Sequence, residues 1–159
     1  MGELRIRQAV RGLVIDEDDR VLLVHFEFPY RSLWHSPGGG IEPGESHHEA
    51  LGRELAEEAG LVGAEIGPHI WTRPHIFPFL DGSHDGQEEA CYLVRTRAFE
   101  PAPQMTWEEL RAEFVDDVRW WTLSEMAASS EMFAPNDLPR LVAEIITNGP
   151  SVAPLTVGI

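Results

Sequence analysis

Three glutamates near the end of one segment, Glu54, Glu57 and Glu58, have the residue type and the spacing to hold a divalent cation. On a helix, Glu54 and Glu58 lie one turn apart, and two like charges so placed repel each other by roughly 0.2–0.5 kcal/mol. A hard cation such as Mg²⁺ prefers carboxylate oxygens and bridges to substrate phosphates. The alternative interpretation of the same residues is a solvated, acidic helix face. The residues that precede the glutamates bear on this choice.

The preceding residues predict a tight loop that leads into a helix. Residues 37–44 are rich in glycine, which tolerates backbone angles that other residues avoid, and Pro43 disfavours helix immediately before it. Ser46 followed by Glu49 is typical of a capping box, so we expect the helix to begin at about Ser46. Gly60 is a natural stop signal. The face of this helix that should pack on a core comprises Leu51, Leu55 and Ala59.

The loop and helix together resemble the signature of the Nudix hydrolases. That signature is a glycine, five residues, a glutamate, seven residues and then R-E-U-x-E-E-x-G-U, where U is apolar. It is met at Gly39, Glu45, Arg53, Glu54, Leu55, Glu57, Glu58, Gly60 and Leu61. Many fixed positions at fixed gaps make this a specific signal. For residues 1–159 the resemblance implies a single domain of the α/β class, a Nudix-type α/β/α sandwich with a mixed central sheet, in which residues 39–61 form the signature box.

The activity that the resemblance implies is metal-dependent hydrolysis of a pyrophosphate linkage in a nucleoside diphosphate linked to another moiety. The implied cofactor is Mg²⁺ or Mn²⁺. Glu57 and Glu58 are the expected principal ligands, together with the backbone carbonyl of Gly38. Glu54 is expected to orient or deprotonate the attacking water and also to touch the metal, while Arg53 holds the glutamates by ion pairing.

Residues outside the box are expected to complete the site. In this family an acid near a later strand approaches the metals or the water, and Glu89 is the preferred candidate here. The general base is therefore either Glu54 or Glu89, although a solvated charge at a strand end is the alternative for Glu89. Arg31, in the aromatic loop 26–33, and Trp121, one of two adjacent tryptophans, are the candidate substrate-binding residues.

The choice of substrate stays open at this point. Nucleoside triphosphates, ADP-sugars, ADP-ribose, dinucleoside polyphosphates and capped RNA ends all fit the implied reaction, and the acidity of the chain disfavours the last of these. A different class of function is a non-catalytic Nudix-like module that senses a nucleotide or ADP-ribose. A homodimer is compatible with the resemblance.

Composition narrows the partners further. The 159 residues carry a formal net charge of −15, which argues against long nucleic acids and anionic membranes as partners. We therefore expect a small nucleotide derivative that either arrives as a metal complex or is partly neutralised by metals already bound to the protein. The single cysteine, Cys91, fits a reducing compartment, and no apolar run approaches the ~18 residues of a membrane helix, so a cytoplasmic location is expected.

The rest of the chain predicts the scaffold. Residues 6–15 and 21–25 are β-rich and are expected to form a hairpin, and residues 88–95 and 118–121 are expected to be strands. Residues 64–79 should hold one or two strands broken at Pro74 and Pro78. Apolar spacing between Leu138 and Ile146 predicts an amphipathic helix. Residues 151–159 are expected to be an irregular tail.

Overall fold

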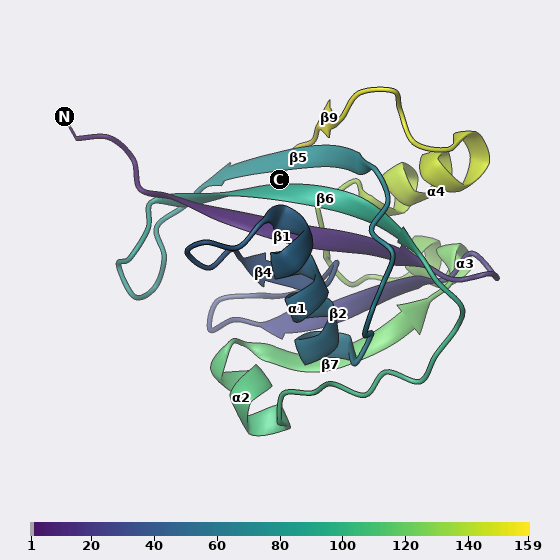
Figure 1. The fold of residues 1–159 in the computed structure, drawn as a ribbon, viewed down its shortest axis with the longest axis horizontal. Helices are drawn as coiled ribbons and strands as arrows, with labels where there is room; N and C mark the ends of the chain where they lie inside the picture. Colours follow the sequence, from purple (N-terminus) through teal and green to yellow (C-terminus); the bar gives the residue numbers. More distant parts are fainter. Residues whose placement is uncertain (1) are drawn as a thin grey trace.

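The fold is taken from a computed structural model that describes residues 2–159 (Figure 1). Its elements, in chain order, are β1 (Ile6–Ile15), β2 (Val21–Glu27), β3 (Ser32–His35), β4 (Gly38–Gly40), α1 (His47–Ala59), β5 (His69–Ile76), β6 (Gly86–Arg95), α2 (Trp107–Ala112), β7 (Val115–Trp121), α3 (Leu123–Ala128), β8 (Phe133–Ala134), α4 (Leu138–Asn148) and β9 (Leu155–Thr156).

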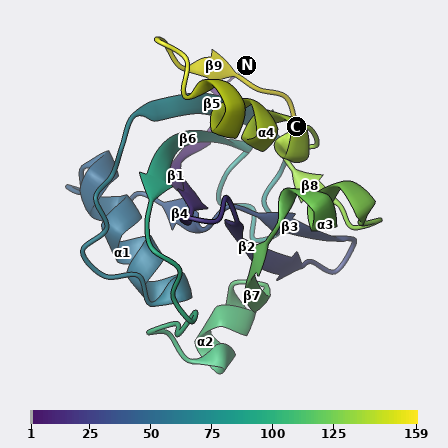
Figure 2. The same cartoon turned by 90° about the vertical axis from the view of Figure 1, so that its right-hand side faces the viewer.

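The strands form one mixed, curled sheet. Its order is β8-β3-β2-β1-β6-β5-β9, with β4 paired to β1 and β7 paired to β2. The central pair, β1 and β6, is parallel from Ile6 opposite Gly86 to Ile15 opposite Arg95. Figure 2 shows α1 on one side of this sheet and α4 on the other. The expected α/β/α sandwich with a mixed central sheet is confirmed.

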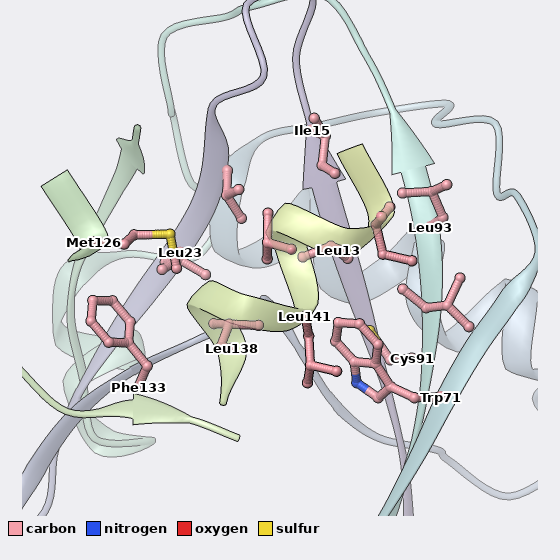
Figure 3. Packing of buried hydrophobic residues seen from close by; sticks show 14 of the residues in the cluster. Leu13, Ile15, Leu23, Trp71, Cys91, Leu93, Met126, Phe133, Leu138 and Leu141 are labelled. Carbon is pink, nitrogen blue, oxygen red and sulfur yellow. The ribbon is translucent and has the colours of Figure 1, made fainter. Parts of the chain in front are cut away.

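Side chains alternate along β1 and divide the core into two layers. Val10 and Val14 belong to the cluster that α1 completes, whereas Leu13 and Ile15 point to the opposite face and pack with residues of α4. Figure 3 shows this second layer. Arg11 lies on the same face as Leu13, two residues earlier, because successive strand residues point to opposite faces. The sheet face toward α4 is therefore apolar at one end and charged at the other.

Helix α1 has the predicted caps. The Ser46 hydroxyl accepts from the Glu49 N–H, and the Glu49 side chain accepts from the Ser46 N–H. Gly60 ends the helix with φ 76°, a left-handed angle that glycine adopts without strain. The predicted apolar face is buried, and a Cβ at Gly12 of β1 would lie only 3.4 Å from side-chain atoms of Leu51 and Leu55. This close approach fixes the helix against the sheet.

The expected hairpin of β1 and β2 is confirmed, with Ile15 opposite Val21, and most of β1 pairs with β6 and β4. Two other expectations about the scaffold need correction. Pro74 lies inside β5 rather than breaking it. β9 pairs only with Trp71 and Thr72, so Pro74 lies on an open edge of β5. Proline has no backbone N–H, and at an open edge no neighbouring strand needs one.

The C-terminal segment is the second correction. Residues 151–159 are not wholly irregular, because Leu155–Thr156 forms the edge strand β9 and Val157 is buried in the core cluster. Among residues 2–159, no helix has both the length and the apolar character that crossing a membrane requires.

Candidate functional site

A cavity of about 710 Å³ lies at the charged end of the sheet. Its volume is within the range of about 300–1,000 Å³ that is common for small-molecule sites. The polar and charged residues that line it are Arg7, Arg11, Arg31, His35, Glu54, Glu58, Arg73, His75, Asp81, Ser83, His84, Gln87, Glu89 and Glu113. Aromatic side chains from the segments 26–30 and 77–79, together with Phe114, complete its walls. We refer to this cavity as the cleft.

The glycines of β4 allow the backbone to approach the glutamates of α1 closely. A Cβ on Gly38, which has φ +152°, would lie 2.0 Å from the carbonyl oxygen of Val10. A Cβ on Gly39 would lie 2.6 Å from Glu54 Oε1. Only glycine leaves room at these two positions, so the loop and the carboxylates form one unit.

Two glutamates of α1, Glu54 and Glu58, are buried and face the cleft. The Gly38 N–H donates to Glu58 Oε1 at 2.7 Å. Burial, followed by the nearby charge of Glu54, raises the pKa of Glu58 to about 8. Burial also raises the pKa of Glu54, against the influence of Arg53. The described residues thus place two carboxylates together with too little positive charge to ionise both easily.

Arg53 ties the loop to the helix. Its Nε and Nη2 donate to the two carboxylate oxygens of Glu45, each at 2.8 Å, and Nη2 also donates to the carbonyl of Gly40 at 3.1 Å. Its Nη1 lies 3.0 Å from Glu54 Oε1 and 3.3 Å from Glu57 Oε2. Hydrogen bonding to Arg53 lowers the pKa of Glu45 to about 2. Arg53 therefore holds the box carboxylates, as its predicted ion pairing requires.

Two further predicted metal ligands, Glu57 and Gly38, are placed less directly. Glu57 does not line the cleft, and its carboxylate contacts Arg53 instead. The carbonyl of Gly38 lies at the cleft but accepts from Arg11 Nη1 at 3.0 Å. A carbonyl oxygen has two lone pairs, so this bond leaves one for a second partner.

Glu89 lies across the cleft from α1 in a different charge environment. Arg11 Nε and Gln87 Nε2 donate to one carboxylate oxygen at 2.6 and 3.0 Å. Arg73 Nη1 donates to the other at 2.8 Å, and His35 Nε2 lies 3.3 Å from it. Burial alone would raise the pKa of Glu89, yet its charged neighbours hold it well below the usual range. Because burial lowers the pKa of His35 to about 4, the two arginines are the cations at neutral pH.

The chemistry of the donors at α1 fits a hard divalent cation. Two buried carboxylates and a backbone carbonyl supply the oxygen ligands that Mg²⁺ prefers, and a bound cation would offset the repulsion between Glu54 and Glu58. A separate group, His25, Glu27 and Asp116, brings its ligand atoms within 4.8 Å of one another but lies outside the cleft.

The two candidate substrate-binding residues have different outcomes. Arg31 lines the cleft. Trp121 does not, and this expectation is corrected: its side chain is 4% exposed and packs in the core cluster against Trp34 and Phe133. Trp120 points to the opposite face, where its indole N–H donates to the carbonyl of Phe99, so neither tryptophan reaches the cleft.

Several residues of the cleft were not predicted from the sequence, notably Arg7, Arg11, Arg73 and His35. A signal for two of them exists in β1, where Arg7 and Arg11 lie four residues apart, on one face of a strand whose other residues are mostly apolar. A buried charge in such a strand needs a partner, and that partner is usually functional or structural. No such local pattern marks His35.

Comparison with known proteins gives a consistent result. The family model described as the NUDIX domain matches residues 5–142. The chain is 33% identical over 96 residues to Nudix hydrolase 25 of Arabidopsis thaliana, a match that covers 54% of this chain and 55% of that protein. It is 28% identical over 130 residues to the RNA pyrophosphohydrolase of Rickettsia bellii, covering 77% and 79% of the two chains.

Solved structures agree on the fold. The NUDIX domain of Shewanella oneidensis NrtR, solved in complex with ADP ribose, superposes with a TM-score of 0.68 at 24% identity, covering 92% of this chain and 91% of that one. The chain spans about half the length of the first curated relatives that it matches. The family model covers most of the chain, and the fold and the glycine-bound glutamates agree with it. The chain belongs to the NUDIX domain family of Nudix hydrolases.

Proposed function

We propose that this protein is a divalent-metal-dependent hydrolase that cleaves a phosphoanhydride bond in a nucleoside diphosphate linked to another moiety. One observation carries the proposal: Glu54 and Glu58 are buried side by side at the wall of a cleft of about 710 Å³ that also presents arginines. A carboxylate pair suits a metal and guanidinium groups suit phosphate, so the cleft has complementary groups for both parts of a metal–nucleotide complex.

Each residue at the α1 side of the cleft has a proposed role in binding the metal. Glu58, Glu57 and the Gly38 carbonyl would hold Mg²⁺ or Mn²⁺, and Glu54 would contribute where its carboxylate faces the cleft. When bound, such a cation makes a water more acidic and stabilises charge on phosphate oxygens. Arg53 positions the glutamates through its bonds to Glu45 and Gly40.

The contacts of the two candidate general bases favour Glu54 over Glu89. The carboxylate of Glu89 has four donor groups within 3.3 Å, and its low pKa makes it a weak proton acceptor. Glu54 has a raised pKa and lies against the glycine loop. We therefore assign proton abstraction to Glu54. Glu89 would instead hold Arg11 and Arg73 in place, or approach the metals from the opposite wall.

The proposed ligand is a small nucleotide derivative. Arg31 and the other arginines of the cleft would bind its phosphates, and the aromatic segments 26–30 and 77–79 offer stacking surfaces for a base. ADP ribose, which the Shewanella oneidensis domain binds, is a member of this class.

The test is a substrate panel. Purified protein is incubated with nucleoside triphosphates, ADP-ribose, nucleotide sugars and dinucleoside polyphosphates, with Mg²⁺, with Mn²⁺ and with a chelator, and the products are identified by mass spectrometry. We expect metal-dependent release of a nucleoside phosphate. The matched variants are Glu58→Gln, which should abolish release, and Glu65→Gln, which alters an exposed glutamate outside the cleft and should not.

Two results would contradict the proposal. Tight binding of a nucleotide without cleavage of any compound, in the wild type with either metal, would favour the non-catalytic sensing module. If Glu58→Gln cleaves the substrate as well as the wild type does, the metal site does not include Glu58.

A further inference from the structure

Arginines are concentrated in the cleft of an otherwise acidic protein. The twelve basic residues of the chain are all arginines, against 27 acidic residues. Four of them, Arg7, Arg11, Arg31 and Arg73, line the cleft. The molecule as a whole carries a strong net negative charge, so four arginines in one cleft stand out. Placing guanidinium groups there removes part of the favourable solvation that water would give them.

These arginines extend from the box loop to the far wall of the cleft. Arg7 lies at the box end, where a Cβ on Gly40 would come within 2.4 Å of its Nη2. Arg73 lies farther along, on β5, bound to Glu89. Arg31, Arg73 and His75 all line the cleft, and the pKa of His75 is lowered by burial first and then by the charges of these two arginines. Arg31 comes from the segment between β2 and β3, so three separate parts of the chain supply the positive charge.

Much of this charge has no partner among residues 2–159. Neither Arg7 nor Arg31 has a described carboxylate within 4.0 Å, whereas Glu89 is shared by Arg11 and Arg73. The Nε atoms of Arg31 and Arg73 are buried and have no acceptor within the described residues. The side chain of Arg73 is itself 7% exposed. A buried donor left unpaired costs about 1–3 kcal/mol, so these groups point to an acceptor that a ligand supplies.

Aromatic contacts do not satisfy these donors. The guanidinium carbon of Arg31 lies 5.8 Å from the ring centre of Tyr30, and that of Arg7 lies 5.8 Å from the ring centre of Phe79. A cation over a ring uses the face of the guanidinium group, whereas hydrogen bonds form in its plane. Arg7 Nη1 also donates to Gln87 Oε1 at 3.2 Å. The stacked rings therefore orient Arg7 and Arg31, while the in-plane N–H groups of Arg31 and the remaining ones of Arg7 stay available.

We propose that Arg7, Arg31 and Arg73 form a second anion subsite, which binds a phosphate beyond the two that flank the cleaved bond. This inference rests on the proposed function. Cations held by α1 would already neutralise the two phosphates at the cleaved bond, so three further guanidinium groups would be in excess for a diphosphate. Guanidinium groups bind phosphate through paired N–H donors. The preferred substrates are therefore compounds with three or more consecutive phosphates, as in nucleoside triphosphates and dinucleoside polyphosphates, rather than nucleoside diphosphate sugars.

The subsite is tested first without catalysis. Binding of inorganic tripolyphosphate and of pyrophosphate is measured by calorimetry in the presence of a chelator. The wild type should bind tripolyphosphate more tightly than pyrophosphate. Arg31→Gln, which breaks no ion pair, should weaken tripolyphosphate binding by about tenfold or more, as loss of one charge-assisted contact implies. Arg95→Gln, which alters an exposed arginine outside the cleft, is the matched control and should change nothing.

A kinetic comparison tests the substrate class. kcat/KM is measured for a nucleoside triphosphate and for a diphosphate sugar of the same nucleoside. In the wild type it should be higher for the triphosphate, and Arg31→Gln should lower it at least about tenfold more for the triphosphate than for the sugar, mainly through KM. Equal losses for both compounds, or a wild-type preference for the sugar, would overturn the subsite while leaving the hydrolase proposal standing.

The experiments can also identify the opposite result, in which the subsite exists but the protein is not a hydrolase. If no nucleotide is cleaved but tripolyphosphate binding depends on Arg31, the proposed function fails and the anion subsite stands. If Arg31→Gln, Arg7→Gln and Arg95→Gln all bind tripolyphosphate as the wild type does, the subsite is wrong, whatever the enzyme cleaves.

Discussion

Buried glutamates line the cleft at two places, a pair on α1 and a single residue on β6, and the two places differ in the charges that surround the carboxylates. On α1, Glu54 and Glu58 lie one turn apart, and the pKa of each is raised chiefly by burial. The charge of Glu54 adds to the rise at Glu58, and that of Glu57 adds to the rise at Glu54. On β6, Glu89 is equally buried, yet its neighbours, His35 first and then Arg11 and Arg73, keep its pKa well below the usual range. Buried glutamates thus have too few positively charged neighbours at one wall of the cleft and two arginine partners at the other.

This difference teaches how the two walls divide the work. A carboxylate pair that lacks a counter-charge gains from binding a cation, so the α1 wall is suited to metal. A carboxylate that already has two arginines gains little from a further cation, and it keeps those arginines aligned toward the cleft. Glu54 and Glu89, which are equivalent candidates from the sequence, are therefore separated by their surroundings.

The largest expected effect is the loss of turnover in Glu58→Gln. Loss of an outer-shell partner of a metal ligand typically costs about 10–100-fold in activity or affinity, and loss of the ligand itself should cost more. Because glutamine has nearly the same shape and needs no counter-charge, the thermal midpoint should not fall. kcat at saturating Mg²⁺ and a thermal melt measure the two quantities. Near wild-type turnover would refute the assignment of the metal wall.

At the other wall, Glu89→Gln should chiefly lower stability. Arg11 and Arg73 would stay buried without their carboxylate, and breaking a buried ion pair in this way costs roughly 3–5 kcal/mol of the free energy of unfolding. Urea denaturation measures this loss. The control is Glu88→Gln, which alters the exposed neighbour on the opposite face of β6. A loss below about 1 kcal/mol in Glu89→Gln would show that the two walls do not differ as described.

The pH dependence of the rate can separate the two candidate bases. If Glu54 accepts the proton, the acidic limb of the kcat/KM profile should disappear or move in Glu54→Gln and persist, on a lower plateau, in Glu89→Gln. A profile measured between pH 4 and pH 9 decides this. An acidic limb that survives both substitutions would remove both residues as the general base.

A smaller effect is expected on the stability of the metal-free protein. The pKa of Glu58 rises from an ordinary 4.5 to about 8, so the folded state binds more protons than the unfolded state between these values. Its contribution to stability is therefore present at low pH and is lost as the pH rises through about 8. Added Mg²⁺ should raise the thermal midpoint by a few degrees more at pH 8 than at pH 6. In Glu58→Gln the dependence on pH should flatten, and an unchanged slope would contradict the raised pKa.

The parts that could be predicted from the sequence are those governed by neighbours along the chain. The capping box of Ser46 and Glu49, the stop at Gly60 and the buried face of Leu51 and Leu55 all follow from spacing within a few helical turns. The spacing of residue types along the chain was less informative about how the strands pair and about which face of the sheet each side chain joins. Trp121 was expected in the pocket because adjacent strand residues face opposite ways, but the sequence cannot say which face holds the pocket and which holds the core.

By itself, then, the sequence determined the box: a glycine loop, a capped helix and carboxylates one turn apart, whose mutual distance is set by helix geometry wherever the helix lies. Only the tertiary structure decided the electrostatics of the opposite wall. Arg11 and Glu89 are 78 residues apart, and they meet because β1 pairs in parallel with β6. The pKa of a buried acid depends on such distant charges, so the same glutamate can hold a metal on one wall and bind two arginines on the other.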